Sequence, residues 1–344
     1  MRLVLAIIAA AIRSSGDSTA ASARVDSARH EVVVTAGSWT LAADGGAHAG
    51  HAGHLPQPPA RFVWPVDGWV HGMRFRAVTR DGRAVPRSLL HHLAIINLSR
   101  RDLFFQIPER LFEMGGETTD IELPRTVGVP VTAGAPMAVT LAWSAAGIEA
   151  LADVSVELTI DWSPANSAPR PLSALLVTMQ VITTAGETSF DLPPGNAKWA
   201  TDYALGVDGR ILVAGGHLHD YGTGIQLRDL STPAAGAVIQ LSSRRDAAGH
   251  VTRIERKMPG LTGNGIPLEA GHLYRLEGGY ANPKATPVER GGMVFLVLLF
   301  APTRVDDWPS ADVNAASWKG YLEQTGLTGN GPVMVMGGLQ HENR

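Results

Sequence analysis

The chain of 344 residues contains no cysteine. Disulfides, thiolate metal sites and cysteine nucleophiles are therefore excluded, and any bound metal must be held by histidine, methionine, carboxylate or backbone oxygen. Charge is also sparse, because charged residues make up 18% of the chain and the formal net charge is -3. A protein with so weak an electrostatic field is not expected to bind nucleic acid.

Long apolar runs are missing as well. The run from Met293 to Pro302 is about half of the ~20 residues that a membrane-spanning helix needs, so we interpret it as a buried strand and expect no membrane span. No GxSxG, Walker or GxGxxG motif stands in a suitable context, which leaves acyl transfer, nucleotide hydrolysis and dinucleotide binding without support. Lysine is rare beside arginine, a composition typical of a GC-rich bacterial gene.

The N-terminal region has the features of an export signal. Arg2, an apolar run over residues 3–12 and the small residues Ala21-Ser22-Ala23 predict a signal segment over 1–23 and a secreted or periplasmic protein. Residues 24–60 follow as an expected mobile arm, rich in Gly, Ala, His and Pro. Its histidines, His48, His51 and His54, recur every third residue, and such a tract can bind copper or zinc by itself.

From Arg61 onward, short β-rich runs alternate with Gly, Pro, Asn and Asp, and the length suits two domains. We therefore predict an all-β protein with two tandem antiparallel β-sandwich domains. Pro193-Pro194-Gly195 marks the expected boundary, because proline removes ladder donors. The expected divisions are an N-terminal sandwich over 61–192, a C-terminal sandwich over 193–302 and an extension over 303–344. Short helices are expected at 108–114 and 315–324.

Three local features carry chemistry. In GGHLHDYGTG, His217 and His219 are two apart on an expected strand, so both imidazoles project from one face at a spacing that suits one metal ion. In LLHHLAIINL, His91 and His92 are adjacent and would share a metal only if the backbone is bulged or different ring nitrogens bind. In GGM, Met293 heads the last core strand, behind two glycines. The alternatives are surface histidines near a turn and ordinary core packing of the methionine.

Taken in this order, HH, HxH and GGM at strand ends resemble the copper type II, ascorbate-dependent monooxygenases, a family that includes peptidylglycine α-hydroxylating and dopamine β-monooxygenases. Three segments carry the similarity: HHLAIINL is similar to that family's HH strand, SFDLPPGNAK to its strand ending in a Pro-Pro-Gly turn at the domain junction, and HLHDYGTGIQLRD to its HTHHLG segment. The resemblance spans residues 61–302.

The resemblance implies two jelly-roll-like domains that face each other across a cleft, with one copper on each. His217, His219 and Met293 would hold the copper that reacts with dioxygen, and His91 and His92 would hold the copper that supplies an electron. The implied activity is hydroxylation of an activated C–H bond in a small-molecule or peptide substrate, with ascorbate or a similar reductant. Imidazole suits both oxidation states of copper, and a thioether favours Cu(I).

The sequence departs from the family at the electron-supplying site. No histidine occurs from Leu93 to Gly216, where the family's third ligand lies, and Leu141-Ala142-Trp143-Ser144 offers Trp and Ser instead. The candidates to complete the site are His71 and the tract of His48, His51 and His54. His272 is a candidate to orient a ligand imidazole, or else an exposed turn residue.

This departure leaves two further hypotheses open. One is a non-catalytic copper-binding protein for storage, transfer or sensing, which keeps only the site of His217, His219 and Met293. The other is a two-sandwich interaction protein without a metal.

Overall fold

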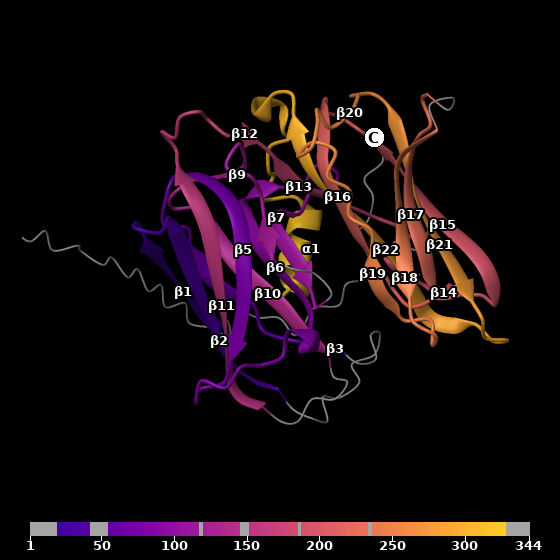
Figure 1. Cartoon of the computed structure of the whole chain (residues 1–344), viewed down its shortest axis with the longest axis horizontal. Helices are drawn as coiled ribbons and strands as arrows, with labels where there is room; N and C mark the ends of the chain where they lie inside the picture. The colour runs from indigo at the N-terminus through magenta and orange to yellow at the C-terminus, as the bar shows by residue number, and fades with distance from the viewer. Residues whose placement is uncertain are drawn as a thin grey trace, which may run out of the picture. The chain divides into compact units, whose positions relative to one another are not determined.

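A computed structural model describes residues 19–41, 54–116, 120–144, 151–184, 187–232 and 236–327. They form a nearly all-β protein, in which the one α-helix described is α1 (Ala316–Gln324), as Figure 1 shows. The chain falls into two compact units. Unit 1 takes the described residues of Met1–Arg100, Pro108–Ser173 and Trp318–Met334, and unit 2 takes those of Arg101–Ile107 and Ala174–Ser317. No helix in the described part of the chain is long and apolar enough to cross a membrane.

Unit 1 is built on one 12-stranded sheet. Its strands are β1 (Thr19–Asp26), β2 (Glu31–Leu41), β3 (His54–Pro56), β4 (Ala60–Val63), β5 (Gly68–Val78), β6 (Leu90–Arg101), β7 (Pro108–Gly115), β8 (Ile121–Glu122), β9 (Val127–Val131), β10 (Pro136–Ser144), β11 (Leu151–Pro164) and β12 (Leu172–Ser173). The order is β12-β9-β5-β11-β2-β1-β4-β10-β6-β7, with β3 on β10 and β8 on β5. The pairing of strands changes at β1, which is antiparallel to β2 but parallel to β4.

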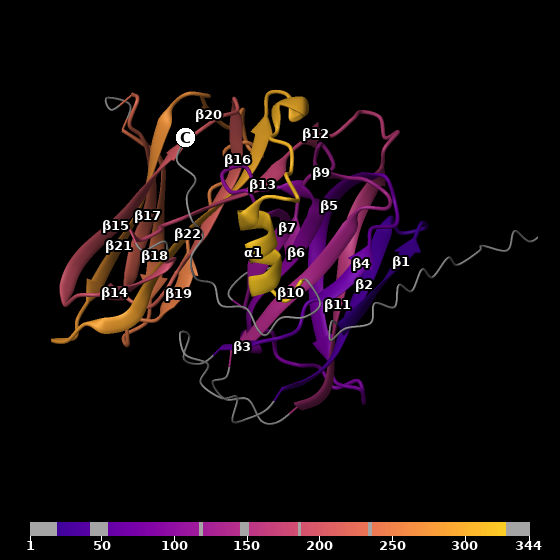
Figure 2. The ribbon, with the colours of Figure 1, turned by 180° about the vertical axis from the view of Figure 1, so that it is seen from behind.

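The sheet of unit 1 folds over on itself into two layers, as the views from both sides show (Figures 1 and 2). In β11, buried residues alternate with more exposed ones from Val154 to Trp162, which is the pattern of a strand with one face on a core. Across that core, the ring of Phe75 in β5 lies 6.4 Å from the ring of Trp143 in β10. The alternating apolar residues therefore hold β5 and β11 against β10.

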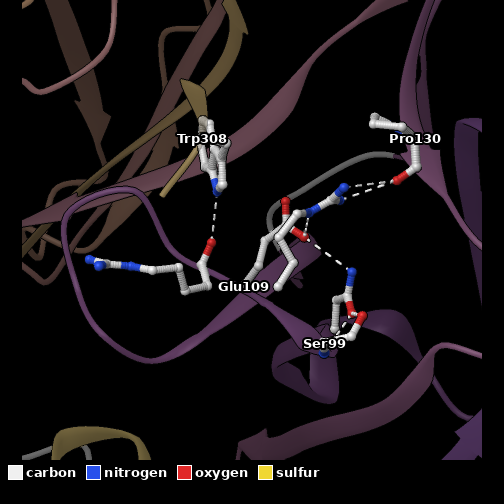
Figure 3. A network of polar contacts seen from close by, with 7 residues as sticks. Ser99, Glu109, Pro130 and Trp308 are labelled. Carbon is white, nitrogen blue, oxygen red and sulfur yellow. Dashed lines mark hydrogen bonds and ion pairs between the residues drawn. The ribbon is translucent and has the colours of Figure 1, made fainter. Parts of the chain in front are cut away.

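A buried ion pair links the neighbouring strands β6 and β7, and its arginine also reaches a strand of the other layer (Figure 3). Arg100 Nε in β6 donates to Glu109 Oε2 in β7 at 2.6 Å, and both terminal nitrogens of Arg100 donate to the carbonyl oxygen of Pro130 in β9 at 3.2 Å. Glu109 is 0% exposed. Within unit 2, Trp308 Nε1 donates to the carbonyl oxygen of Arg101 at 2.9 Å, so the segment after β22 packs on the last residue of β6.

The expected mobile arm over 24–60 is wrong for residues 24–41. These residues form the end of β1 and all of β2, and Val32 and Val34 are 0% exposed. β2 pairs with both β1 and β11, so alternate valines fill the core while backbone groups complete two ladders. Ala21-Ser22-Ala23, the expected end of the signal segment, lies inside β1 opposite 34–36. Residues 1–18 of that segment, and His48 and His51, lie outside the described residues.

Unit 2 contains two five-stranded sheets. Their strands are β13 (Leu175–Gln180), β14 (Ser189–Leu192), β15 (Gly195–Ala204), β16 (Gly209–Leu218), β17 (Gly222–Asp229), β18 (Ala237–Arg245), β19 (Val251–Ile254), β20 (Ile266–Leu268), β21 (Leu273–Asn282) and β22 (Val288–Pro302). One sheet has the order β13-β22-β16-β20 with β14 on β22, and the other has the order β15-β21-β17-β18-β19. The Phe190 ring stacks on Trp199 at 4.4 Å and meets Tyr280 edge-on at 5.8 Å, so the two sheets form a sandwich.

The apolar run from Met293 to Pro302 is a buried strand, as predicted. The chain divides after Ser173 and not after Leu192, because β13 and β14 both pair with β22. Pro193-Pro194 accordingly lies between two sheets of one unit and not at a domain junction. Residues 108–114 form β7 instead of a helix, whereas the helix expected at 315–324 is α1.

Candidate metal centre

His217 and Met293 lie on two neighbouring strands, and His219 directly follows the first of them. His217 in β16 lies opposite Phe295 in β22, and the N–H of His219 points to the carbonyl oxygen of Met293 at 3.4 Å. Opposite residues of an antiparallel pair project from the same face, and so do residues two apart. The two imidazoles and the thioether therefore share one face, and the ring centroids of His217 and His219 are 5.4 Å apart.

This face is the outer one of the unit 2 sandwich. A Cβ on Gly216 would lie 2.4 Å from Cδ1 of Ile225 in β17, and a Cβ on Gly278 in β21 would lie 2.2 Å from Cγ2 of Val294. Gly216 and Val294 thus face the second sheet. Their neighbours along the strands, His217 and Met293, point to the opposite side.

The glycines before these residues permit the close packing. A Cβ on Gly292 would lie 2.1 Å from the ring of Phe190, so only glycine lets that ring cover the strand beside Met293. Gly216 has the same role against Ile225, whereas a Cβ on Gly215 would meet nothing within 4 Å. One glycine of each pair therefore marks a close approach: Gly216 to the second sheet, and Gly292 to Phe190 of the neighbouring strand β14.

The donor set suits copper. Met293 is 4% exposed, and His217 and His219 are half-buried with Nε2 of His219 shielded from solvent. In the described part of the chain, no group of three histidine, aspartate or glutamate side chains is placed to hold a metal ion. The thioether of Met293 is therefore the candidate for a third side-chain ligand at this face. Two imidazoles with one thioether are ligands that copper accepts in both oxidation states, whereas Mg²⁺ and Ca²⁺ require oxygen donors.

Tyr280, from β21 of the facing sheet, holds the backbone of this site. Its hydroxyl accepts a hydrogen bond from the N–H of Met293 at 2.9 Å and donates one to the carbonyl oxygen of the same residue. Tyr280 is 2% exposed, and this burial raises its pKa although backbone hydrogen bonds from Met293 and His219 act in the opposite direction. The phenol therefore keeps its proton. No sequence motif identified this role, because the contact joins the two sheets.

A second neighbour of Met293 was also missed. Ser189 in β14 lies directly opposite Met293 on the side of β22 away from His219, so its hydroxyl shares the face of the candidate ligands. The residue is 0% exposed, and its Oγ makes no hydrogen bond to the residues that the structure describes. The sequence places it in SFDLPPG, but only the register of β14 against β22 brings it beside the thioether.

His91 and His92 are brought together by an irregularity in β6. The register with β10 runs from His92 opposite Ala142 to Leu90 opposite Trp143, so His91 is the extra residue of a bulge. A bulge is one of the two conditions under which these neighbours could share a metal. Their Nδ1 atoms are 2.9 Å apart. Two nitrogens about 2.0–2.1 Å from one metal at roughly 90° would be about 2.9 Å apart, so the pair fits two adjacent coordination positions.

His71, one of the histidines considered as a third ligand, does not complete this pair. His71 is 1% exposed, with Nδ1 2.8 Å from the carbonyl oxygen of Val127 and Nε2 2.7 Å from Oγ of Ser163. Both ring nitrogens are engaged, so His71 is a core residue and not a ligand. Burial lowers its pKa. Trp143, where the family's third ligand was expected, is 0% exposed. His54 begins β3, and its side chain is outside the described structure.

His272 is not beside the candidate ligands. Its Nδ1 lies 2.9 Å from Oδ2 of Asp229, and its Nε2 lies 3.4 Å from Oε2 of Glu269. It immediately precedes β21, whereas Tyr280 lies near the far end of that strand, roughly 25 Å along an extended chain. His272 therefore does not orient His217 or His219.

Comparison of the chain with protein-family models and with curated proteins finds no match. Any assignment of the two histidine sites therefore depends on their own residues and geometry.

Proposed function

We propose that this protein is a copper-dependent, monooxygenase-like oxidoreductase whose copper is held by His217, His219 and Met293. The observation that carries the proposal is the convergence of two imidazoles and one buried thioether on the same face of β16 and β22. The order of these residues after the HH pair, which resembles that of the ascorbate-dependent copper monooxygenases, supplies the reaction class.

Each residue has a defined part. His217 and His219 would supply neutral ring nitrogens, and Met293 would supply a soft sulfur that favours Cu(I). Bound copper would supply one-electron chemistry toward dioxygen, with ascorbate or a similar reductant as the electron source. The buried backbone of Met293 and the half-buried imidazoles limit the access of water to the ligand atoms.

His91 and His92 are the residues that would hold a second, electron-supplying copper through their adjacent Nδ1 atoms. The substrate would be a small molecule or a peptide with an activated C–H bond, and the protein would be secreted or periplasmic. The jelly-roll-like connectivity and the cleft between the domains remain predictions of the resemblance.

A second candidate function is supported by the His91/His92 pair itself. The sequence has no histidine from Leu93 to Gly216, where the family's third ligand lies, and His71 uses both of its ring nitrogens elsewhere. A weakened electron-supplying site favours a non-catalytic copper-binding protein for storage, transfer or sensing, which keeps only the site of His217, His219 and Met293.

The test is copper analysis with electron paramagnetic resonance of Cu(II) on the full chain, together with ascorbate-driven oxygen consumption. We expect His217→Ala to remove one copper with its spectrum, and His272→Ala, remote from the site, to leave copper binding unchanged. Copper bound without reductant-dependent oxygen consumption for any C–H donor favours the binding protein. If the chain takes up no copper, or takes it up equally with His217→Ala, both functions are refuted.

A further inference from the structure

At the end of β16, the side chain of Tyr280 from the facing sheet bonds to backbone groups of the neighbouring strand β22. The last register pair of β16 and β22 is Leu218 opposite Val294, and beyond it the N–H of His219 reaches the carbonyl oxygen of Met293 only at 3.4 Å. The hydroxyl of Tyr280 bonds to both the N–H and the carbonyl oxygen of Met293 and also interacts with the His219 backbone.

We propose that Tyr280 is a positioning residue, which sets the distance between the thioether of Met293 and the imidazole of His219. The inference rests on the proposed copper site. In a regular antiparallel ladder, the N–H and C=O of one residue both bond to the residue opposite. Here the phenol occupies that place, so it acts as a wedge between the ends of two strands that each carry a ligand.

The wedge is itself held firmly. Tyr280 is 2% exposed and meets the ring of Phe190 edge-on at 5.8 Å. Its strand, β21, pairs with β15 and β17 on both sides. The second sheet therefore fixes the position of the hydroxyl. Through its two hydrogen bonds, the hydroxyl in turn fixes the backbone of Met293. A rigid backbone under a flexible thioether restricts where the sulfur can lie.

Unit 2 offers a matched control in Tyr203. Its hydroxyl accepts a hydrogen bond from the N–H of Gln180 at 3.0 Å and donates one to the carbonyl oxygen of Gln180, and the residue is 0% exposed. Tyr203→Phe thus removes the same two backbone contacts as Tyr280→Phe. It does so on β13, which carries none of the three proposed ligands.

The experiment uses the full chain, with Cu(I) as the probe under reducing, oxygen-free conditions. Affinity is measured by competition with a chromophoric Cu(I) chelator, and the Cu(II)/Cu(I) midpoint potential is measured in parallel. We expect Tyr280→Phe to weaken Cu(I) binding by about 10- to 100-fold, the usual effect of losing a partner that orients a ligand. The potential should fall, because a misplaced thioether stabilises Cu(I) less. Tyr203→Phe should leave both values near those of the unmodified chain.

A double-mutant cycle separates positioning from general destabilisation. In a Met293→Leu background the thioether is gone, so Tyr280→Phe should produce no further loss of Cu(I) affinity. Equal effects of the two tyrosine variants, or full additivity with Met293→Leu, would overturn the inference and leave the copper site standing. Copper binding that is absent or independent of His217 in the unmodified chain would instead overturn the proposed function, and the inference with it.

Discussion

Met293→Leu separates ligation from packing at the candidate centre. Leucine and methionine have similar volumes, so the exchange in a well-packed core costs less than about 1.5 kcal/mol. The site is suitable for this exchange because Met293 is 4% exposed and its backbone is held by Tyr280, whose contacts do not involve the side chain. The copper-free variant is therefore expected to fold and to unfold close to the original midpoint.

The loss of the thioether should instead lower the stabilisation that added Cu(I) gives to the folded state. A ligand at 100 times its Kd stabilises the folded state by about 2.7 kcal/mol, and a tenfold weaker site under the same conditions gives only about 1.4 kcal/mol. For a unit of this size, 1 kcal/mol corresponds to roughly 2–4 °C in Tm. We expect the copper-induced rise in Tm, measured by calorimetry with and without Cu(I), to be about halved or smaller in Met293→Leu.

The control is Met293→Ala, which removes the thioether and also leaves a cavity. It should lower the stability of the copper-free chain by about 2–5 kcal/mol, far more than leucine does, while the loss of copper-induced stabilisation is similar. An equal rise in Tm on adding Cu(I) to the original chain and to Met293→Leu would refute ligation by the thioether and reduce Met293 to a packing residue.

Two predictions concern unit 1. Burial lowers the pKa of His71, so between this lowered value and about 6.5 the unfolded chain binds a proton that the folded chain does not, and the free energy of unfolding should rise with pH by up to about 1.4 kcal/mol per pH unit in that window. His71→Gln should remove this part of the slope in urea titrations from about pH 5 to about pH 7.5, and an unchanged slope would contradict it. At the ion pair of Figure 3, Arg100→Met should cost about 3–5 kcal/mol, because it takes the cation from a carboxylate that is 0% exposed. Glu109→Gln should cost less, since the Arg100 side chain is 22% exposed and still bonds Pro130, and the reverse order in urea denaturation would be evidence against this account.

The periodicity of apolar residues along the sequence is sufficient to predict local secondary structure. Alternation of apolar and polar residues predicts strands, and the same period of two places His217 and His219 on one face before any fold is known. The apolar alternation of β2 directly precedes Gly- and His-rich sequence, and composition alone therefore assigns it to a mobile arm. The core position of Val32 and Val34 depends on pairing with β11, a strand more than 100 residues away in the sequence.

The sequence by itself therefore determined that the protein is β-rich, that any metal has only histidine, methionine and oxygen donors, and that two pairs of histidines are available. Tertiary structure alone decided that β16 lies beside β22, which brings Met293 to His217 and His219, and that a bulge turns His91 toward His92. It also placed Tyr280 between the strand ends. The physical reason is that periodicity fixes the face on which a side chain lies, whereas strand partners and register follow from contacts between segments far apart in the chain.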